Sequence, residues 1–457
     1  MSMNENIQES QIFYFFFQKN KILWYNDSMF GNRILIMADD LTGANDTAIQ
    51  FVKHGMTALV VTDAMFCESS VFSTYDVLSF NSDSRGMSSK DAYHEVGRLI
   101  QRLRAARLEG LFYKKVDSVL RGNPGQELEA VMDELEVPLA IVSPSFPANR
   151  SVLEDGMLKS GRAGQSTINA VKIFADSMDK KADNIPLEII RQGCVQTAEY
   201  VLTRSKNGVQ VFVADAVTDD DLQVISRLST AVGKPLILAG AAALANQIAQ
   251  NMKRNQTAIN QQLSLDSRAS VLVVAGTRQG ETAAQIAALS ETLSVPVIRF
   301  KVDLVEKGKS EEAIRLAFED AMRYMESGSA LCVVAVESMF KSEIPEGNVA
   351  WNQTDSDADS DAISAALGSL TGKLSESLRF AVMITTGGDT TLEICRSLGI
   401  TGIQPLAEIC PGIPIGKISG GNCEGRHIIT KSGRFGNRDT LVEILKYVEN
   451  WKVREGL

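Results

Sequence analysis

The stretch Ile34-Leu-Ile-Met-Ala-Asp39-Asp40-Leu-Thr42-Gly43-Ala-Asn45-Asp46-Thr47-Ala decides the fold, because an apolar run ends there in two carboxylates and a small polar turn. The run predicts a buried strand, and the apolar spacing over 44–52 predicts a helix that Gly55 ends. Residues 58–61 predict a second strand. In open parallel sheets ligands bind at the carboxyl ends of strands, which is where the loop of this β-loop-α-β unit lies.

Strand-like runs and helical stretches alternate along the rest of the chain, which predicts an α/β fold with largely parallel sheets flanked by helices. The first half has strand-like runs at 75–80, 111–116, 139–143, 209–213 and 235–238, and helical stretches such as 89–106 and 125–135. The second half starts again at Ser270, with runs at 270–276, 295–300, 331–336 and 380–385.

The length of 457 residues exceeds what one hydrophobic core usually supports. We therefore expect two α/β domains, each with its own largely parallel sheet, and ligand sites in the cleft between them. The polar stretch 251–268 is the expected linker between domains at 29–250 and 269–457. Residues 1–28 lack the cleavage site of a signal peptide, and we expect a disordered extension outside the fold.

Composition and charge exclude several classes of protein. A formal net charge of −10 argues against nucleic acid or an anionic membrane as partner, since both need a cationic surface. No run of about 18 apolar residues indicates a membrane helix. Six scattered cysteines without a Cys-x-x-Cys pair indicate neither zinc nor a disulfide framework, and reduced thiols in a cytoplasmic protein are the simpler interpretation. The three histidines have no metal-ligand spacing.

Glycine-rich turns between strand and helix recur in the second half, and such turns let backbone N–H groups and the helix dipole face a phosphate. The strongest candidate is Gly387-Gly388-Asp389-Thr390, after the run that ends near Thr385. An ordinary turn that uses Gly for positive φ is its alternative explanation. Three further turns lie at 275–282, 411–416 and 430–436. Together they favour a nucleotide site, although no P-loop motif occurs.

Charged residues follow the strands of the first half instead. Asn81-Ser-Asp-Ser-Arg85 follows one run, and Lys115, Asp117 and Arg121 follow another. Such cations could clamp a carboxylate, and arginine offers a bidentate fork. For each of these residues taken alone, a solvated surface charge is the alternative explanation. That explanation is less favoured if several strand ends meet in one crevice.

Two other kinds of site are disfavoured by the residues themselves. The acidic run 355–361 superficially resembles a calcium loop, but it lacks the glycine and the glutamate that such loops require. A solvated loop before a helix explains it better. No Gly-x-Ser-x-Gly elbow is present, which argues against a covalent hydrolase.

The motifs taken in order resemble the four-carbon acid sugar kinase family over about residues 32–448. The matching stretches are Ala38-Asp-Asp-Leu-Thr-Gly-Ala-Asn-Asp-Thr-Ala, Lys115-x-Asp-Ser-x-Leu-Arg-Gly-Asn123, Thr386-Gly-Gly-Asp-Thr390, Pro411-Gly-Ile-Pro414 and Lys431-Ser-Gly-Arg-Phe-Gly436. Many members have Ser, Glu and Asn where this chain has Thr277, Asp389 and Arg434, and the last difference adds a cation beside the expected phosphate site.

The resemblance implies ATP-dependent phosphorylation, with Mg²⁺, of the terminal 4-hydroxyl of a four-carbon sugar acid. D-threonate is the favoured substrate, with D-erythronate or an oxo-tetronate as alternatives. A ribokinase-like sugar kinase and a non-catalytic sugar-acid binding protein are the rival classes. The sequence decides neither the substrate epimer nor whether the chain forms a homo-oligomer.

The resemblance also assigns site residues by motif position. Acid-sugar contacts are expected at Asp39, Asp40, Arg85, Lys115, Asp117 and Arg121. Nucleotide contacts are expected at Gly276, Thr277, Gly387, Gly388, Asp389, Thr390, Ser432 and Gly433. We expect either Asp39 or Asp40 to be the catalytic base while the other binds substrate hydroxyls, with Lys115 and Arg121 on the substrate carboxylate. The metal ligands stay unassigned.

Overall fold

The computed structural model describes residues 33–62, 74–108, 110–161, 166–252, 270–340 and 357–452. The expected extension at 1–28 lies outside these ranges, as do residues 253–268 of the expected linker. Residues 341–356, which include the start of the acidic run 355–361, lie outside them too. Within the described residues, no helix is long and apolar enough to cross a membrane.

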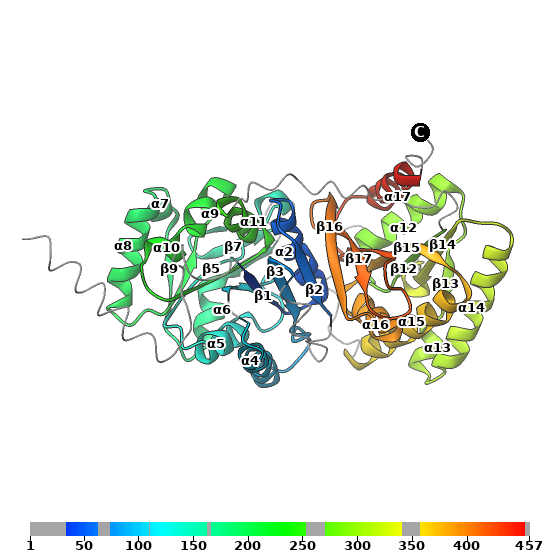
Figure 1. The fold of residues 1–457 in the computed structure, drawn as a ribbon, viewed down its shortest axis with the longest axis horizontal. Helices are drawn as coiled ribbons and strands as arrows, with labels where there is room; N and C mark the ends of the chain where they lie inside the picture. The colour runs from blue at the N-terminus through cyan, green and yellow to red at the C-terminus, as the bar shows by residue number, and fades with distance from the viewer. Residues whose placement is uncertain are drawn as a thin grey trace, which may run out of the picture.

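The first half is built on parallel strands with helices on both faces (Figure 1). In spatial order its strands are β2 (Ala58–Val61), β3 (Val77–Asn81), β1 (Ile34–Ala38), β4 (Leu111–Lys115), β11 (Leu236–Gly240), β5 (Leu139–Ser143), β10 (Val211–Ala214) and β9 (Ala182–Ile185). Its helices are α2 (Leu41–Val52), α4 (Ser89–Ala105), α5 (Pro124–Glu134), α6 (Ala170–Ser177), α7 (Leu187–Ile190), α8 (Cys194–Ser205), α9 (Asp219–Ser226), α10 (Leu228–Ala231) and α11 (Ala242–Asn251). The predicted parallel α/β arrangement is confirmed.

A small antiparallel sheet that the sequence did not predict is inserted after β5. Its strands are β6 (Val152–Glu154), β7 (Met157–Ser160) and β8 (Ser166–Asn169), preceded by the 3-10 turn η3 (Pro147–Asn149). Asp215 attaches it to the main sheet, since the carboxylate accepts the backbone N–H groups of Asp155 and Gly156 at 2.8 and 3.0 Å.

The second half has a parallel sheet that continues into an antiparallel one. Its parallel strands are β13 (Ile298–Phe300), β14 (Leu331–Val336), β12 (Ser270–Ala275), β15 (Phe380–Thr386) and β18 (His427–Lys431), followed by the antiparallel β17 (Ile413–Ser419) and β16 (Gly402–Cys410). Around them lie α12 (Gly280–Leu293), α13 (Val302–Glu306), α14 (Ser310–Glu326), α15 (Asp357–Ser377), α16 (Gly388–Leu398), α17 (Thr440–Lys452) and the 3-10 turn η5 (Glu337–Phe340).

The interpretation of 411–416 as a phosphate-binding type of turn is wrong. Only Pro411 and Gly412 turn the chain, and β17 begins at Ile413. Gly412 has φ +76°, which suits the hairpin between β16 and β17. Ile413 and Ile415 are fully buried because they point into the core from alternate positions of the strand. The glycines of this stretch therefore serve a hairpin and not a strand-to-helix loop.

The sheets of the two halves are joined edge to edge, which the sequence did not predict. β16 pairs antiparallel with β2, with Ile403 opposite Val60. Thr62 extends the contact, since its N–H donates to Thr401 O at 3.1 Å and its hydroxyl to Ile400 O at 2.6 Å. Within the described residues, fifteen strands thus form one continuous sheet.

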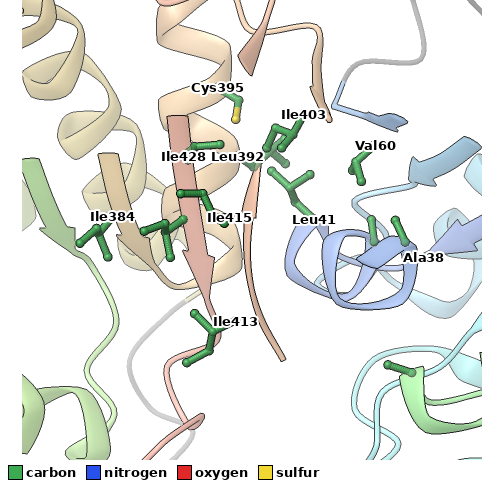
Figure 2. Close-up of a cluster of buried hydrophobic side chains, with 14 of the residues drawn as sticks. Ala38, Leu41, Val60, Ile384, Leu392, Cys395, Ile403, Ile413, Ile415 and Ile428 are labelled. Carbon is green, nitrogen blue, oxygen red and sulfur yellow. The ribbon is translucent and has the colours of Figure 1, made fainter. Parts of the chain in front are cut away.

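Helix α2 packs over this junction and belongs to both halves. All of its residues from Leu41 to Phe51 are buried. Figure 2 shows Leu41 of α2 and Val60 of β2 beside Ile403 and Leu392 of the second half. The opening motif is therefore held from both sides by a shared hydrophobic core, which fixes the position of the loop that precedes the helix.

We predict that Gly402→Ala weakens the junction. A Cβ at this position of β16 would lie 2.9 Å from Leu59 Cδ1 and 3.2 Å from Val60 O, so the strands would have to separate. Overpacking of this kind costs about 1–3 kcal/mol, measured as the free energy of unfolding in urea. Gly280→Ala is the control, because a Cβ there meets nothing within 4 Å. Equal stability of the two variants would contradict the prediction.

Candidate active site

The order of the strands brings the charged loops of the first half together. β1 lies between β3 and β4, and its chain continues as Asp39-Asp40. Arg85 lies in the loop after β3, and Lys115 is the last residue of β4. Because the three strands are parallel, all these residues lie at one edge of the sheet. β1 is also where the strand order reverses, the usual place of a ligand crevice in such sheets.

Arg85 is the centre of the charged cluster. Its Nε and Nη2 donate to the two carboxylate oxygens of Asp39 at 2.7 and 3.0 Å, and its Nη1 donates to Asp40 at 2.5 Å. Nη2 also lies 3.6 Å from an Asp117 oxygen. Burial alone would raise the pKa of Asp39, but the positive charges of Arg85 and of two nearby lysines lower it below its ordinary value. Arg85 thereby holds the side chains of both aspartates in fixed positions.

Asp40 connects this cluster to α2 and to the second half. Its side chain caps the helix, since Oδ1 accepts the N–H of Gly43 at 2.7 Å. A Cβ on Gly43 would lie 2.6 Å from the same oxygen, so the residue has to be glycine. A Cβ on Gly388 would lie 3.1 Å from Asp40 Oδ2, which places the first residue of α16 against this carboxylate.

The cations after β4 have different partners. Arg121 forms two hydrogen bonds with Asp117, at 3.2 and 2.6 Å, and despite burial Arg121 and Arg85 lower the pKa of Asp117. Lys115 is buried, and its Nζ donates to Val116 O at 2.7 Å. Arg85, Lys115 and Arg121 thus line one cavity.

A buried ion pair supports this edge of the sheet from beneath. Lys114 Nζ lies 2.8 Å from Glu127, and both side chains are inaccessible to solvent. Ser84, one residue before Arg85, donates to the other oxygen of Glu127 at 2.7 Å. Because breaking a buried pair leaves an unpaired charge, the pair fixes the loop that carries Arg85.

The loops of the second half come together at the carboxyl ends of β12, β15 and β18. A Cβ on Gly276 would lie only 2.0 Å from Thr390 Oγ1, and one on Gly433 would lie 2.4 Å from Thr277 Oγ1. Gly387, with φ +100°, turns the chain from β15 into α16. The first turn of α16 presents backbone N–H groups and the positive end of the helix dipole at this point, which suits an anion.

Lys431 holds the last of these loops, a role that the sequence did not reveal. It is completely buried at the end of β18, and its Nζ donates to Ser432 O, Phe435 O and Thr282 Oγ1 at 2.8, 3.2 and 3.3 Å. Burial lowers the pKa of its ammonium group to about 7, although Glu281 acts in the opposite direction. Arg434, the departure from the family pattern, is exposed and donates to Gln279 at 3.2 Å.

A cavity between the halves is lined by both sets of loops. It is lined by Asp40, Thr42, Gly43, Asp46, Arg85, Lys115, Asp117, Ser118, Arg121, Phe146, Ala241, Ala242, Ser432 and Phe435. Asp39, which pairs with Arg85, is not among these residues, and of the expected nucleotide contacts only Ser432 is. Sequence reasoning missed Thr42 and Asp46, although both lie in the motif on which it began, and Phe435, which lies in the last glycine-rich turn.

Family comparisons agree with this division of the molecule. Residues 34–248 match a sugar-binding N-terminal domain, and residues 272–441 match a nucleotide-binding C-terminal domain. The chain is 29% identical to the D-threonate kinase of Bordetella bronchiseptica, covering 91% of this chain and 97% of that protein. It is 24% identical to the D-erythronate kinase of Heliobacterium modesticaldum (91% and 97%) and 26% identical to the 3-oxo-tetronate kinase of Pseudomonas savastanoi pv. phaseolicola (90% and 96%).

Solved structures show the same fold. A Haemophilus influenzae protein superposes with a TM-score of 0.64 at 22% identity, covering 90% of this chain and 99% of that one. A Salmonella typhimurium LT2 protein gives 0.72 at 20% identity, covering 91% and 99%. The two matched domains and the kinase relatives, rather than these structures, define an enzyme of the kinase class. The chain belongs to the four-carbon acid sugar kinase family.

We predict that Arg85→Met destabilises the fold in a pH-dependent way. The variant leaves the buried Asp39 without its main cation, which costs about 3–5 kcal/mol of unfolding free energy near pH 7. An unpaired buried carboxyl has a raised pKa, so it takes up a proton in the folded state as the pH falls. The deficit relative to the native chain should therefore shrink between pH 7 and pH 4.

Urea unfolding at several pH values measures this deficit. Arg98→Met is the matched control, since Arg98 pairs with Glu95 on the exposed face of α4 and such pairs contribute little. A deficit that does not change with pH would show that Arg85 acts by packing alone.

Proposed function

We propose that this protein is an ATP-dependent kinase that phosphorylates the terminal 4-hydroxyl of a four-carbon sugar acid, with D-threonate as the first candidate. The observation that carries the proposal is the meeting of Asp40 with Gly388 at the start of α16. This contact places the cavity, which is lined by the cations Arg85, Lys115 and Arg121, beside the N-terminus of α16. A helix N-terminus suits a phosphate. The substrates of the relatives named above support the substrate class.

The cations of the cavity would hold the carboxylate of the acid. Lys115 and Arg121 both line the cavity, and the side chain of Arg121 remains 42% exposed while it pairs with Asp117. Arginine forms bidentate contacts with carboxylates, and lysine adds a mobile point charge. Fixing the carboxylate at this end would direct the far hydroxyl of a four-carbon chain toward the second half, where the nucleotide is proposed to bind.

Of the two aspartates expected as the base, Asp40 has the better support. The oxygens of both aspartates accept hydrogen bonds, but Asp39 does not line the cavity. Asp40 lines it and touches the phosphate side. In the proposed step the hydroxyl oxygen bonds to the γ-phosphorus, the bond from that phosphorus to the leaving ADP oxygen breaks, and the hydroxyl proton passes to Asp40. Asp39 would position Arg85.

The residues at the start of α16 fit a magnesium ion. Desolvation raises the pKa of Asp389 and the nearby charge of Asp40 raises it further, while the charges of Arg85 and Arg121 oppose these effects only in part. Mg²⁺ is usually held by one or two carboxylates together with phosphates and water. Among the described residues no group of three or more metal ligands occurs, which agrees with that mode. Asp389 would hold the ion, which would neutralise charge on the phosphates.

We predict that Asp40→Asn lowers kcat by about 10²–10⁴-fold while ADP affinity changes little. Asparagine is also a good helix N-cap, so α2 should keep its start. A coupled ADP-release assay gives kcat, and calorimetry gives the affinity for ADP. Asp176→Asn, which changes an exposed carboxylate of α6, is the control. Turnover close to native in Asp40→Asn would remove this residue from the proposed role.

The same assay with a panel of acids tests the function itself. We expect ADP release with at least one of D-threonate, D-erythronate and 3-oxo-tetronate, and none with their four-carbon analogues that lack the terminal hydroxyl. A native chain that binds ATP and these acids in calorimetry yet releases no ADP would be a binding protein, and the kinase proposal would fail.

A further inference from the structure

Two buried oxygen atoms on α2 lack partners where the helix faces the cavity. Thr42 and Asp46 lie four positions apart, on one face of the helix, and each is 4% exposed. Both line the cavity. Neither Thr42 Oγ1 nor Asp46 Oδ1 has a hydrogen-bond partner among the described residues.

Polar side chains elsewhere on the same helix are satisfied. Asn45 donates to Leu41 O at 3.1 Å, Thr47 to Gly43 O at 2.8 Å and Gln50 to Asp46 O at 3.0 Å. The unpaired oxygens are therefore confined to the face that borders the cavity. A buried polar atom without a partner costs about 1–3 kcal/mol, so a ligand that supplies the missing bonds would recover this energy.

Glycines of the second half lie close to both oxygens. A Cβ on Gly388 would lie 3.5 Å from Thr42 Oγ1, and a Cβ on Gly412 would lie 3.5 Å from Asp46 Oδ1. The position beside Gly412 is taken by the ring of Phe435, which a Cβ there would approach to 2.3 Å. The open space that the two residues share is therefore the cavity, which Phe435 also lines.

The charges around Asp46 leave its carboxylate short of hydrogen-bond donors. Burial raises its pKa to about 7. Lys115 on β4 and Lys53, the residue that follows α2, oppose this effect, while Glu408 on β16 and the cap residue Asp40 add to it. The hydroxyl of Tyr113 on β4 donates to Ala241 O at 2.7 Å. A hydroxyl that donates to this carboxylate would therefore be bound strongly.

We propose that Thr42 and Asp46 form a subsite for a hydroxyl of the acid other than the one that is phosphorylated, and that they favour hydroxy acids over oxo acids. The inference rests on the proposed function and extends it. The hydroxyl donates its hydrogen to Asp46 and accepts one from Thr42. A keto oxygen has no hydrogen to donate, so with an oxo acid the ionised Asp46 carboxylate stays unpaired, and the preference for hydroxy acids should be largest above pH 7.

Thr42→Val and Asp46→Leu test the subsite, because each removes the unpaired oxygen while keeping a side chain of similar size. We expect KM for D-threonate to rise at least ~10-fold in each variant, with kcat within ~3-fold of native and ADP affinity unchanged. KM for 3-oxo-tetronate should change less than ~3-fold in Asp46→Leu, whereas it should also rise in Thr42→Val, because a keto oxygen accepts a hydrogen bond from Thr42 as well. Without ligand, Thr42→Val should be at least as stable as the native chain, since it loses an unsatisfied group.

Thr47→Val is the matched control, because Thr47 lies on the same helix with its hydroxyl bonded to Gly43 O and does not line the cavity. It should keep the native KM and lose some stability. Native KM values for D-threonate in both test variants would overturn the subsite. A fall of kcat with KM unchanged would overturn it too, by placing Asp46 in proton transfer, as would a loss of ADP affinity, by placing these residues on the nucleotide side.

Calorimetry with D-threonate separates this inference from the proposed function. If the native chain binds the acid without phosphorylating it and Thr42→Val loses that binding, the kinase proposal fails and the subsite stands. If the native chain phosphorylates the acid and both variants bind it as the native chain does, the subsite alone fails.

Discussion

The pairing of β2 with β16 is the constraint on which the arrangement of the site depends. It joins two parallel sheets into one and sets how the carboxyl ends of their strands face each other. The hydrogen bonds of Thr62 and the apolar cluster around Leu41 fix the same relation. Because these contacts lie beside the opening motif, they place Asp40 directly against the start of α16.

The acidic residues of the site fall into two groups, which differ in how far neighbouring cations compensate their charge. Around Arg85 the carboxylates are paired, so they are rigid and their charge is compensated. Desolvation raises the pKa of Asp46, which is buried, and of Asp389, which is exposed at the start of α16, so both gain most from a ligand that brings hydrogen or positive charge. The carboxylates around Arg85 can hold reactants in position, whereas Asp46 and Asp389 can change their interactions when a reactant binds.

The sequence predicted those parts of the site that follow directly from a strand. An apolar run that ends in Asp39-Asp40 or in Lys115 carries its own signal, since parallel strands place such ends together. The partner of β16 could not be predicted, because pairing at a sheet edge depends on residues far away in the chain. Thr42 and Asp46 resemble a solvated helix face in sequence, and only the packing around them shows that they are buried without partners. Lys431 was missed for the same reason, because a lysine in a glycine-rich turn is normally assumed to point to solvent.

The β16–β17 hairpin belongs by sequence to the nucleotide-binding part, yet it covers the outer strand of the sugar-binding part. If the chain were cut near residue 252, β2 would become an open sheet edge bearing Leu59, Val60 and Val61, a template for other strands. The first half made alone should therefore associate with itself, whereas the intact chain protects that edge internally. The two halves suit different ligands, but each would leave a sheet edge uncovered without the other.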